Sequence, residues 1–107
     1  MVVGVCRLDL LIRASQSLKD KRQVLRKIGD RTRQKFNVAL AEVGGNDLWQ
    51  RSQIGFAVVG NEGRHVTSMV DTIVGFIDGL HVAEIAGREV ELLNYGDTFG
   101  EEGEVEP

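Results

Sequence analysis

The sequence predicts an α+β fold, a ferredoxin-like βαββαβ sandwich in which two helices cover one face of a four-stranded antiparallel sheet. Three observations lead to this prediction. Four segments alternate in hydrophobicity with a period of two, which is typical of strands. Two segments repeat apolar residues every three or four positions, which is typical of helices. The order strand, helix, strand, strand, helix, strand, with right-handed crossovers, places both helices on one side and pairs the first strand with the third.

The first strand is predicted over residues 2–12, and its two faces differ in polarity. One face is apolar throughout and is assigned to the core: Val2, Gly4, Cys6, Leu8, Leu10 and Ile12. The other face is mixed: Val3, Val5, Arg7, Asp9 and Leu11.

A basic helix is predicted next, from Leu18 to about Lys35. Ser17 is a good N-cap, and Asp20 three residues later completes a capping box. The apolar arc of this helix should pack on the sheet: Leu18, Val24, Leu25 and Ile28. The opposite arc is cationic and offers a contact surface for nucleic acid or a partner: Lys19, Arg22, Arg26, Lys27 and Arg33.

Lys21 is the exception in this helix, because its angle places it inside the apolar arc. A lysine in the first turn can run its aliphatic stem past the end of the core and keep its ammonium in water, which is the simpler expectation. The alternative is a lysine aimed at a ligand or at an acidic partner.

The second and third strands are predicted over residues 36–43 and 54–59, as a hairpin with a turn cluster at residues 44–47. Trp49 and Arg51 lie in the connection. Trp49 either closes one end of the core or forms a partner-binding knob with Arg51, since both residue types are enriched in interface hot spots.

A second helix is predicted over residues 62–80, with Asn61 as its cap and Gly79 as its stop. The fourth strand follows over residues 82–95 and should be bent or bulged at Gly87. Residues 96–107 are rich in glycine and acid with little to bury, so we expect a disordered tail after a single domain of residues 1–95.

Composition narrows the class of protein. The chain has 107 residues, of which 42% are hydrophobic, enough for one modest core. No apolar run is long enough for a membrane span. The N-terminus has the alternation of a strand, so we expect no signal peptide. A single cysteine fits a reducing compartment, so we expect a cytoplasmic protein.

Charge is distributed unevenly along the chain. Residues 1–41 hold ten Lys/Arg and three Asp/Glu, a formal charge of +7, whereas residues 42–107 hold three and thirteen, a charge of −10. This asymmetry indicates either a surface that binds polyanions or two surfaces that attract each other between subunits.

Catalytic, metal and cofactor motifs are not recognisable in the sequence. His65, His81 and Cys6 match no metal-ligand spacing, the serines lack a nucleophile-elbow context, and Gly60–Gly63 is not a phosphate loop. The sequence therefore favours a protein that is not an enzyme and carries no cofactor.

The sheet face away from the helices is expected to be small, flat and largely apolar. It lacks the aromatic residues with which RNA-recognition domains of this topology stack bases, so we reject RNA binding through the sheet. Such a face suits pairing of two copies into a homodimer. Its expected residues are Val3, Val5, Ala39, Ala41, Ala57 and Val59.

Three blocks of the sequence resemble the YlxP-like family of small bacterial proteins of unassigned function. They are Ser-Leu-Lys-Asp-Lys-Arg at residues 17–22, Phe-Asn-Val-Ala-Leu-Ala-Glu-Val at 36–43 and Asp-Leu-Trp-Gln-Arg at 47–51. The resemblance covers about residues 1–95 and implies a ferredoxin-like fold and association with the ribosome. It transfers no catalytic residue, and it points to Lys19, Lys21 and Arg22 as part of a functional surface.

Three functions remain open from the sequence. The leading one is a non-enzymatic accessory factor that contacts phosphates of ribosomal RNA, or a ribosomal protein, through the basic helix. The second is a protein-interaction module that self-associates through its open sheet face. The third is a small-molecule binder or enzyme that uses Lys21 and the turn around Asp47.

Overall fold

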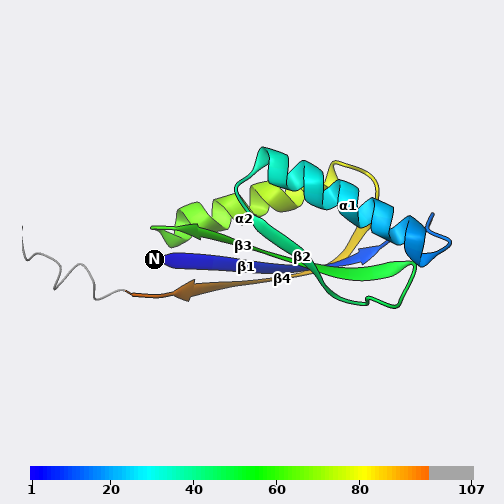
Figure 1. Cartoon of the computed structure of the whole chain (residues 1–107). Helices are drawn as coiled ribbons and strands as arrows, with labels where there is room; N and C mark the ends of the chain where they lie inside the picture. The colour runs from blue at the N-terminus through cyan, green and yellow to red at the C-terminus, as the bar shows by residue number, and fades with distance from the viewer. Residues whose placement is uncertain (97–107) are drawn as a thin grey trace, which may run out of the picture.

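The computed structural model describes residues 1–96, and the predicted tail lies outside them except for Gly96. Six elements follow the predicted order. They are β1 (Val2–Leu11), α1 (Leu18–Lys35), β2 (Ala39–Gly44), β3 (Arg51–Gly60), α2 (Gly63–Asp78) and β4 (Glu84–Asn94) (Figure 1).

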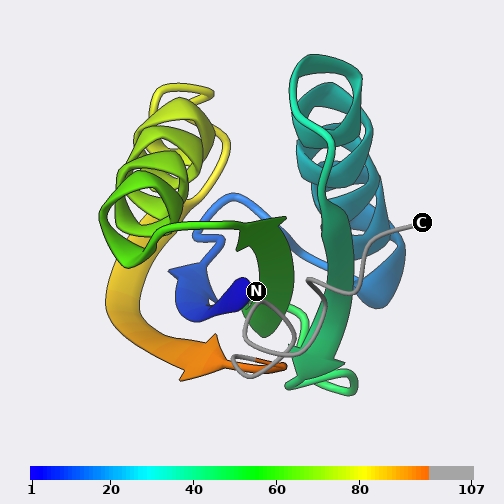
Figure 2. The same cartoon turned by 90° about the vertical axis from the view of Figure 1, so that its left-hand side faces the viewer.

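The four strands form one antiparallel sheet in the order β2-β3-β1-β4. Both helices lie on the same side of this sheet, side by side, and leave the opposite face uncovered (Figure 2). The ferredoxin-like α+β arrangement is therefore confirmed, with β1 and β3 as central neighbours.

The core lies between the sheet and the helices. Every second residue of β1 from Val2 to Leu10 is buried, and so is Ile12, as the alternation predicts. The bulky face of β3 is also turned inward, so Phe56 is buried. The inward stripe of α2 completes the core with Val66, Val70, Ile73, Val74 and Ile77.

The strand register arranges the uncovered face in rows that cross the sheet. At one end Val3 lies between Val59 and Leu93, and the next row sets Val5 between Ala57 and Glu91. The third row is Ala41, Gly55, Arg7 and Glu89, and the fourth is Gly44, Gln53, Asp9 and Gly87. The uncovered face is thus apolar at one end and polar at the other, rather than apolar throughout.

Some predicted boundaries are wrong by a few residues. Residues 36–38 precede β2, because Phe36 ends α1 and packs edge to face on Phe76, with ring centroids 5.5 Å apart. Glu62 rather than Asn61 is the N-cap of α2, because the helix begins one residue later than expected. In β4 the register shifts between Ile85 and Gly87, so the predicted bulge lies at Ala86.

Candidate functional site

Ser17 is the N-cap of α1, as the sequence predicts, but the Asp20 carboxylate bonds the residue before Ser17 and so does not complete a capping box. The Oγ of Ser17 accepts a hydrogen bond from the backbone N–H of Asp20 at 3.0 Å. The Oδ2 of Asp20 accepts one from the backbone N–H of Gln16 at 2.9 Å. The first bond satisfies a donor that the first turn would otherwise leave unpaired, and the second ties the residue before the cap to the helix.

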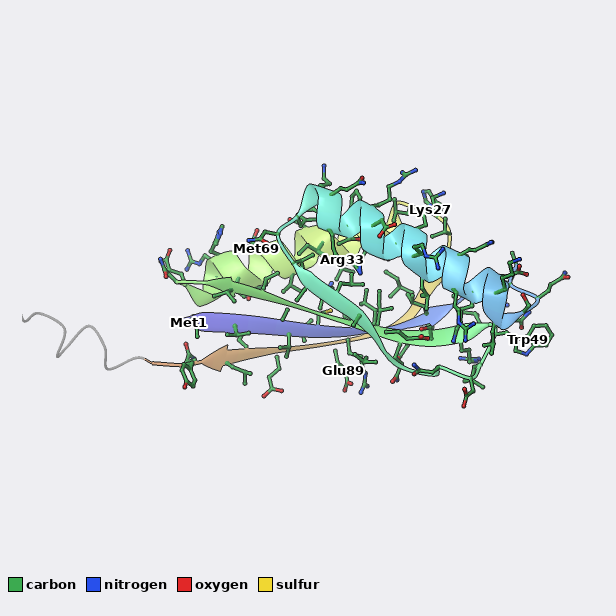
Figure 3. All side chains as sticks on the ribbon, in the orientation of Figure 1. Met1, Lys27, Arg33, Trp49, Met69 and Glu89 are labelled. Atoms are coloured by element: carbon green, nitrogen blue, oxygen red, sulfur yellow. The ribbon has the colours of Figure 1, made fainter. Side chains whose placement is uncertain are left out.

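The cationic residues of α1 predicted to face outward are exposed: Lys19, Arg22, Arg26, Lys27 and Arg33. Lys27 points away from the sheet (Figure 3). Among the described residues only Arg33 of this set has an ion pair, at 3.7 Å to Asp30. From Lys19 to Arg33 the helix rises about 21 Å, at ~1.5 Å per residue. The face is therefore a long row of cations that solvent and partners can reach.

Lys21 does not belong to this exposed face. Its side chain is 1% exposed, so the expectation of an ammonium in water is wrong. The ammonium donates to the carbonyl oxygen of Gly45 at 2.7 Å and lies 3.3 Å from those of Asn46 and Arg51. The physical reason is the β2–β3 loop, residues 45–50, which folds over the first turn of α1 and turns its carbonyls toward the lysine.

A carboxylate completes the surroundings of Lys21. The Oε2 of Glu42 lies 3.0 Å from the ammonium, and the side chain of Glu42 is 22% exposed. The hydroxyl of Ser52 donates to the same oxygen at 2.7 Å. A buried charge is tolerated when it is paired and hydrogen-bonded, and both conditions are met here. Lys21 therefore acts as a fixed internal clamp between α1 and the β2–β3 loop.

All three blocks that carry the family resemblance meet at this clamp. Residues 17–22 supply the cap and Lys21, residues 36–43 supply Glu42, and residues 47–51 supply the Arg51 carbonyl that Lys21 bonds. The amide of Gln50 adds a second link, because its Nε2 donates to the carbonyl oxygen of Ser15 at 3.0 Å. The blocks therefore hold α1 and the β2–β3 loop together, although they are separated in the sequence.

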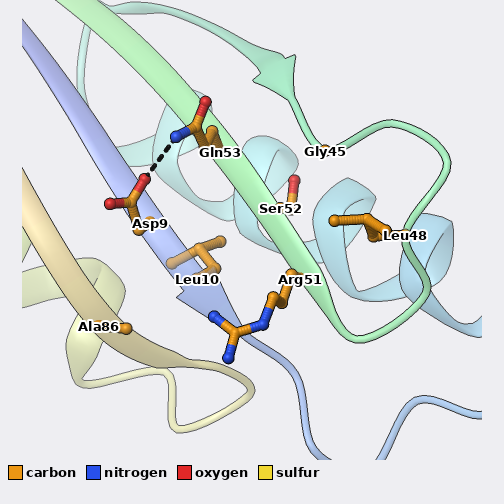
Figure 4. Close-up of a pocket in the computed structure, with 8 residues that line it drawn as sticks. All are labelled: Asp9, Leu10, Gly45, Leu48, Arg51, Ser52, Gln53 and Ala86. Carbon is orange, nitrogen blue, oxygen red and sulfur yellow. Dashed lines mark hydrogen bonds between the residues drawn. The ribbon is translucent and has the colours of Figure 1, made fainter.

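Trp49 does not close the end of the core. Its side chain is 51% exposed and lies at the far tip of the molecule (Figure 3). Lys21 occupies the space beneath the loop instead. Arg51 is also exposed, but its guanidinium borders a hollow on the uncovered sheet face, together with Asp9, Gln53 and Leu48 (Figure 4). Neither Lys21 nor Trp49 lines that hollow.

The residues expected to mediate self-association lie on the uncovered face. Ala39 and Ala41 are exposed, Val3, Val5 and Ala57 are half-buried, and Val59 is 58% exposed. Glu89 lies on this side of the sheet, in the row of Arg7 (Figure 3).

Cys6 is buried in β1. Burial raises the pKa of the Cys6 thiol above its ordinary value of 9.0, the nearby Arg88 lowers it in part, and Asp71 raises it.

In residues 1–96 no three His, Cys, Asp or Glu side chains are grouped so that they could hold a metal ion. No helix in that range is both long and apolar enough to cross a membrane.

The sequence did not predict the partners of Lys21 or the pairing of Asp9 with Gln53. The one signal for Glu42 is weak: it alternates with Val38 and Leu40 along residues 36–43, which places it on the inward side with them. Asp9 and Gln53 lie 44 positions apart, so only the strand register brings them together.

The comparisons with known proteins agree on a family. Residues 3–90 match the family described as "Protein of unknown function (DUF503)". The chain is 35% identical over 77 residues to "Uncharacterized protein YlxP" of Bacillus subtilis (strain 168), a match that covers 72% of this chain and 84% of that protein. The solved structure of "De novo designed protein Foldit4" is similar with a TM-score of 0.50 and 14% identity. That match covers 90% of this chain and all of the designed one, and it bears on the fold alone.

Proposed function

The chain belongs to the DUF503 family of proteins of unknown function, and from this premise we propose that it is a non-enzymatic accessory factor that binds RNA phosphates through α1. The observation that carries the proposal is the row of exposed cations on that helix. Lys19, Arg22, Arg26 and Lys27 have no ion pair within the part of the chain that the structure describes.

Binding of this kind depends on the phosphate charge of the RNA and not on its base sequence. Lysine and arginine contacts to phosphates release counterions and carry no base information, so affinity should depend strongly on salt and weakly on RNA sequence. The net charge of −3 does not oppose this, because the negative charge belongs mainly to residues 42–107. The cations Lys19, Arg22, Arg26 and Lys27 are exposed, and Lys27 points away from the sheet (Figure 3).

The first experiment measures the salt dependence of RNA binding. The probes are ribosomal RNA and purified ribosomal particles, because the family resemblance implies ribosome association. Four phosphate contacts predict a slope of about −2.8 to −3.6 for log affinity against log salt. Affinity should then fall about 50- to 150-fold between about 50 and 200 mM salt. Binding that does not change over this range would refute the proposal.

The second experiment locates the contact on α1. The triple variant Arg22→Gln, Arg26→Gln and Lys27→Gln should weaken binding and reduce the magnitude of the salt slope by about two to three. A matched control removes the same amount of charge elsewhere, with Arg13→Gln, Arg64→Gln and Arg88→Gln. The control breaks two exposed ion pairs, with Glu84 and Asp71, which contribute little stability. Equal loss of binding in both variants would mean that only net charge matters.

A second candidate function is supported by the apolar end of the uncovered face. Val59 is 58% exposed and Leu93 is 45% exposed, one on each side of Val3. We infer that this end pairs with a second copy of the chain. Burying ~400 Å² of apolar area per copy would contribute about 10 kcal/mol per copy before the cost of association.

The charges beside this apolar end are self-complementary. Arg7 forms an ion pair with Glu89, and Glu91 lies in the neighbouring row. A two-fold axis through these rows would bring Arg7 of one copy near the carboxylates of the other, as an isologous interface requires.

Sedimentation measurements test the pairing. The wild-type chain should sediment as two copies, and Val59→Lys should yield a single copy, because a charge cannot be buried there without a partner. The control Gln34→Glu changes the charge of an exposed residue on α1 and should leave the assembly intact. A wild-type chain that stays a single copy at every concentration would refute this candidate.

A further inference from the structure

The polar end of the uncovered face holds a fixed carboxylate. Gln53 Nε2 donates to Asp9 Oδ1 at 2.8 Å, between the central strands β1 and β3. Both residues are half-buried although they lie on the open side of the sheet. The second carboxylate oxygen, Asp9 Oδ2, has no hydrogen bond to any residue from 1 to 96.

Glycines on the edge strands leave room for this pair. A Cβ at Gly87 would lie 2.6 Å from Asp9 Oδ2, and one at Gly44 would collide with Gln53 Oε1. Both side chains therefore lie flat along their row, over backbone that carries no side chain. Larger residues at either glycine would push the carboxylate or the amide out of place.

Arg51 brings the opposite charge to the same hollow. Its guanidinium has no ion pair or side-chain hydrogen bond within the described range, and it borders a volume of about 480 Å³ together with Asp9 and Gln53 (Figure 4). Leu48 supplies an apolar wall. The volume falls in the range of small-molecule sites, about 300–1,000 Å³.

The wall of the hollow is held from behind. Lys21 bonds the carbonyls of Gly45 and Arg51, and both residues line the hollow. Leu48 donates its backbone N–H to the carbonyl of Gly45 at 3.0 Å, which fixes the turn that carries the leucine. The groups that border the hollow are thus positioned before any ligand arrives, which lowers the entropy cost of binding.

We propose that this hollow binds a free α-amino acid with an apolar side chain. The α-carboxylate pairs with Arg51, the α-ammonium with Asp9, and the apolar side chain packs on Leu48. An anion bound at Arg51 would be repelled by the Asp9 carboxylate. A cation bound at Asp9 would be repelled by the Arg51 guanidinium. A zwitterion satisfies both groups, and the guanidinium fork suits a carboxylate. This site is independent of RNA binding, because it lies on the face opposite α1.

The test uses three probes that differ in one charge each. They are L-leucine, L-leucinamide, which lacks the carboxylate, and N-acetyl-L-leucine, which lacks the ammonium. Binding is followed by NMR shifts of the backbone amides of Gly45, Gln53 and Ala86. L-leucine should bind with a Kd of about 1 mM, as expected for a small ligand in an open site. Each analogue should bind about tenfold more weakly, because it loses one charged hydrogen-bonding group.

Two variants assign each charge to its residue. In Arg51→Gln the advantage of leucine over leucinamide should disappear, and in Asp9→Asn the advantage of leucine over N-acetyl-leucine should disappear. Arg64→Gln, at the start of α2, should bind all three probes as the wild type does. The proposal fails if leucine causes no shift at these amides, or if either analogue binds the wild-type chain as tightly as leucine.

Discussion

The ammonium of Lys21 lies 2.7 Å from the carbonyl oxygen of Gly45, inside the protein, with the lysine side chain 1% exposed. This bond joins the first turn of α1 to the loop between β2 and β3, 24 residues further along the chain. Three carbonyls and the Glu42 carboxylate replace the water that an exposed lysine would have. Such an arrangement stabilises the fold only while every member is present.

Replacing Lys21 by Met should therefore be costly. The variant leaves the Glu42 carboxylate without its cation and removes the lysine hydrogen bonds to the carbonyls of Gly45, Asn46 and Arg51, so the free energy of unfolding should fall by about 3–5 kcal/mol. Equilibrium urea denaturation measures this loss. The double variant Lys21→Met, Glu42→Gln should recover part of it, because no unpaired charge then remains. A single variant that loses less than ~1 kcal/mol would contradict the clamp.

Two glycine substitutions should have opposite effects on stability. A Cβ at Gly4 would lie 2.6 Å from Val66 Cγ1 and 3.3 Å from Val70 Cγ2, where α2 packs on β1. Gly4→Ala should therefore cost about 1–3 kcal/mol. Gly75 is exposed on α2 with nothing within 4 Å of a Cβ, so Gly75→Ala should stabilise by about 0.5–1 kcal/mol. Thermal unfolding of the two variants provides the comparison, and a stabilised Gly4→Ala would contradict the packing.

The buried thiol of Cys6 should react slowly in the folded protein. Burial raises the pKa of the thiol, so the reactive thiolate is scarce at about pH 8, and labelling with a thiol reagent should need unfolding. As the pH rises above 9.0, the unfolded chain loses the Cys6 thiol proton while the folded chain still holds it. Stability should thus fall as pH rises above the ordinary value of 9.0 and be insensitive to this group below it.

The matched variant for that measurement is Cys6→Ala, which removes the titrating group. Its stability profile should lack the part of the alkaline decline that belongs to Cys6. Rapid labelling of the native wild-type chain would show that the thiol is accessible, contrary to its burial in β1.

Removing residues 97–107 should strengthen RNA binding. This segment contains five carboxylates, and its loss changes the formal net charge from −3 to +2. Long-range repulsion of phosphates would decrease, and the affinity at low salt should rise about two- to fivefold. A chain in which the five acidic residues are replaced by their amides separates charge from length. Absence of RNA binding in both the full and the shortened chain would favour a protein-interaction role instead.

Fold and local caps could be predicted from the sequence because they depend on periodicity and on near neighbours. Alternation assigned the buried face of β1, and the Ser17–Asp20 cap spans three residues. The surroundings of Trp49 could not be predicted in this way. Its exposure depends on how the β2–β3 loop lies over α1, and that contact joins segments about 30 residues apart.

The amino-acid order by itself determined two amphipathic helices, four strands and a cationic side to α1, because hydrophobic burial acts on the repeat of each element. Only the tertiary structure determined which groups surround the Lys21 ammonium. It also determined that Asp9, Gln53 and Arg51 border one hollow. The helical angle predicts that Lys21 faces inward. It does not predict that loop carbonyls and Glu42 would bond the lysine ammonium. Such polar contacts are set by the register and loop path of distant segments, which no local pattern encodes.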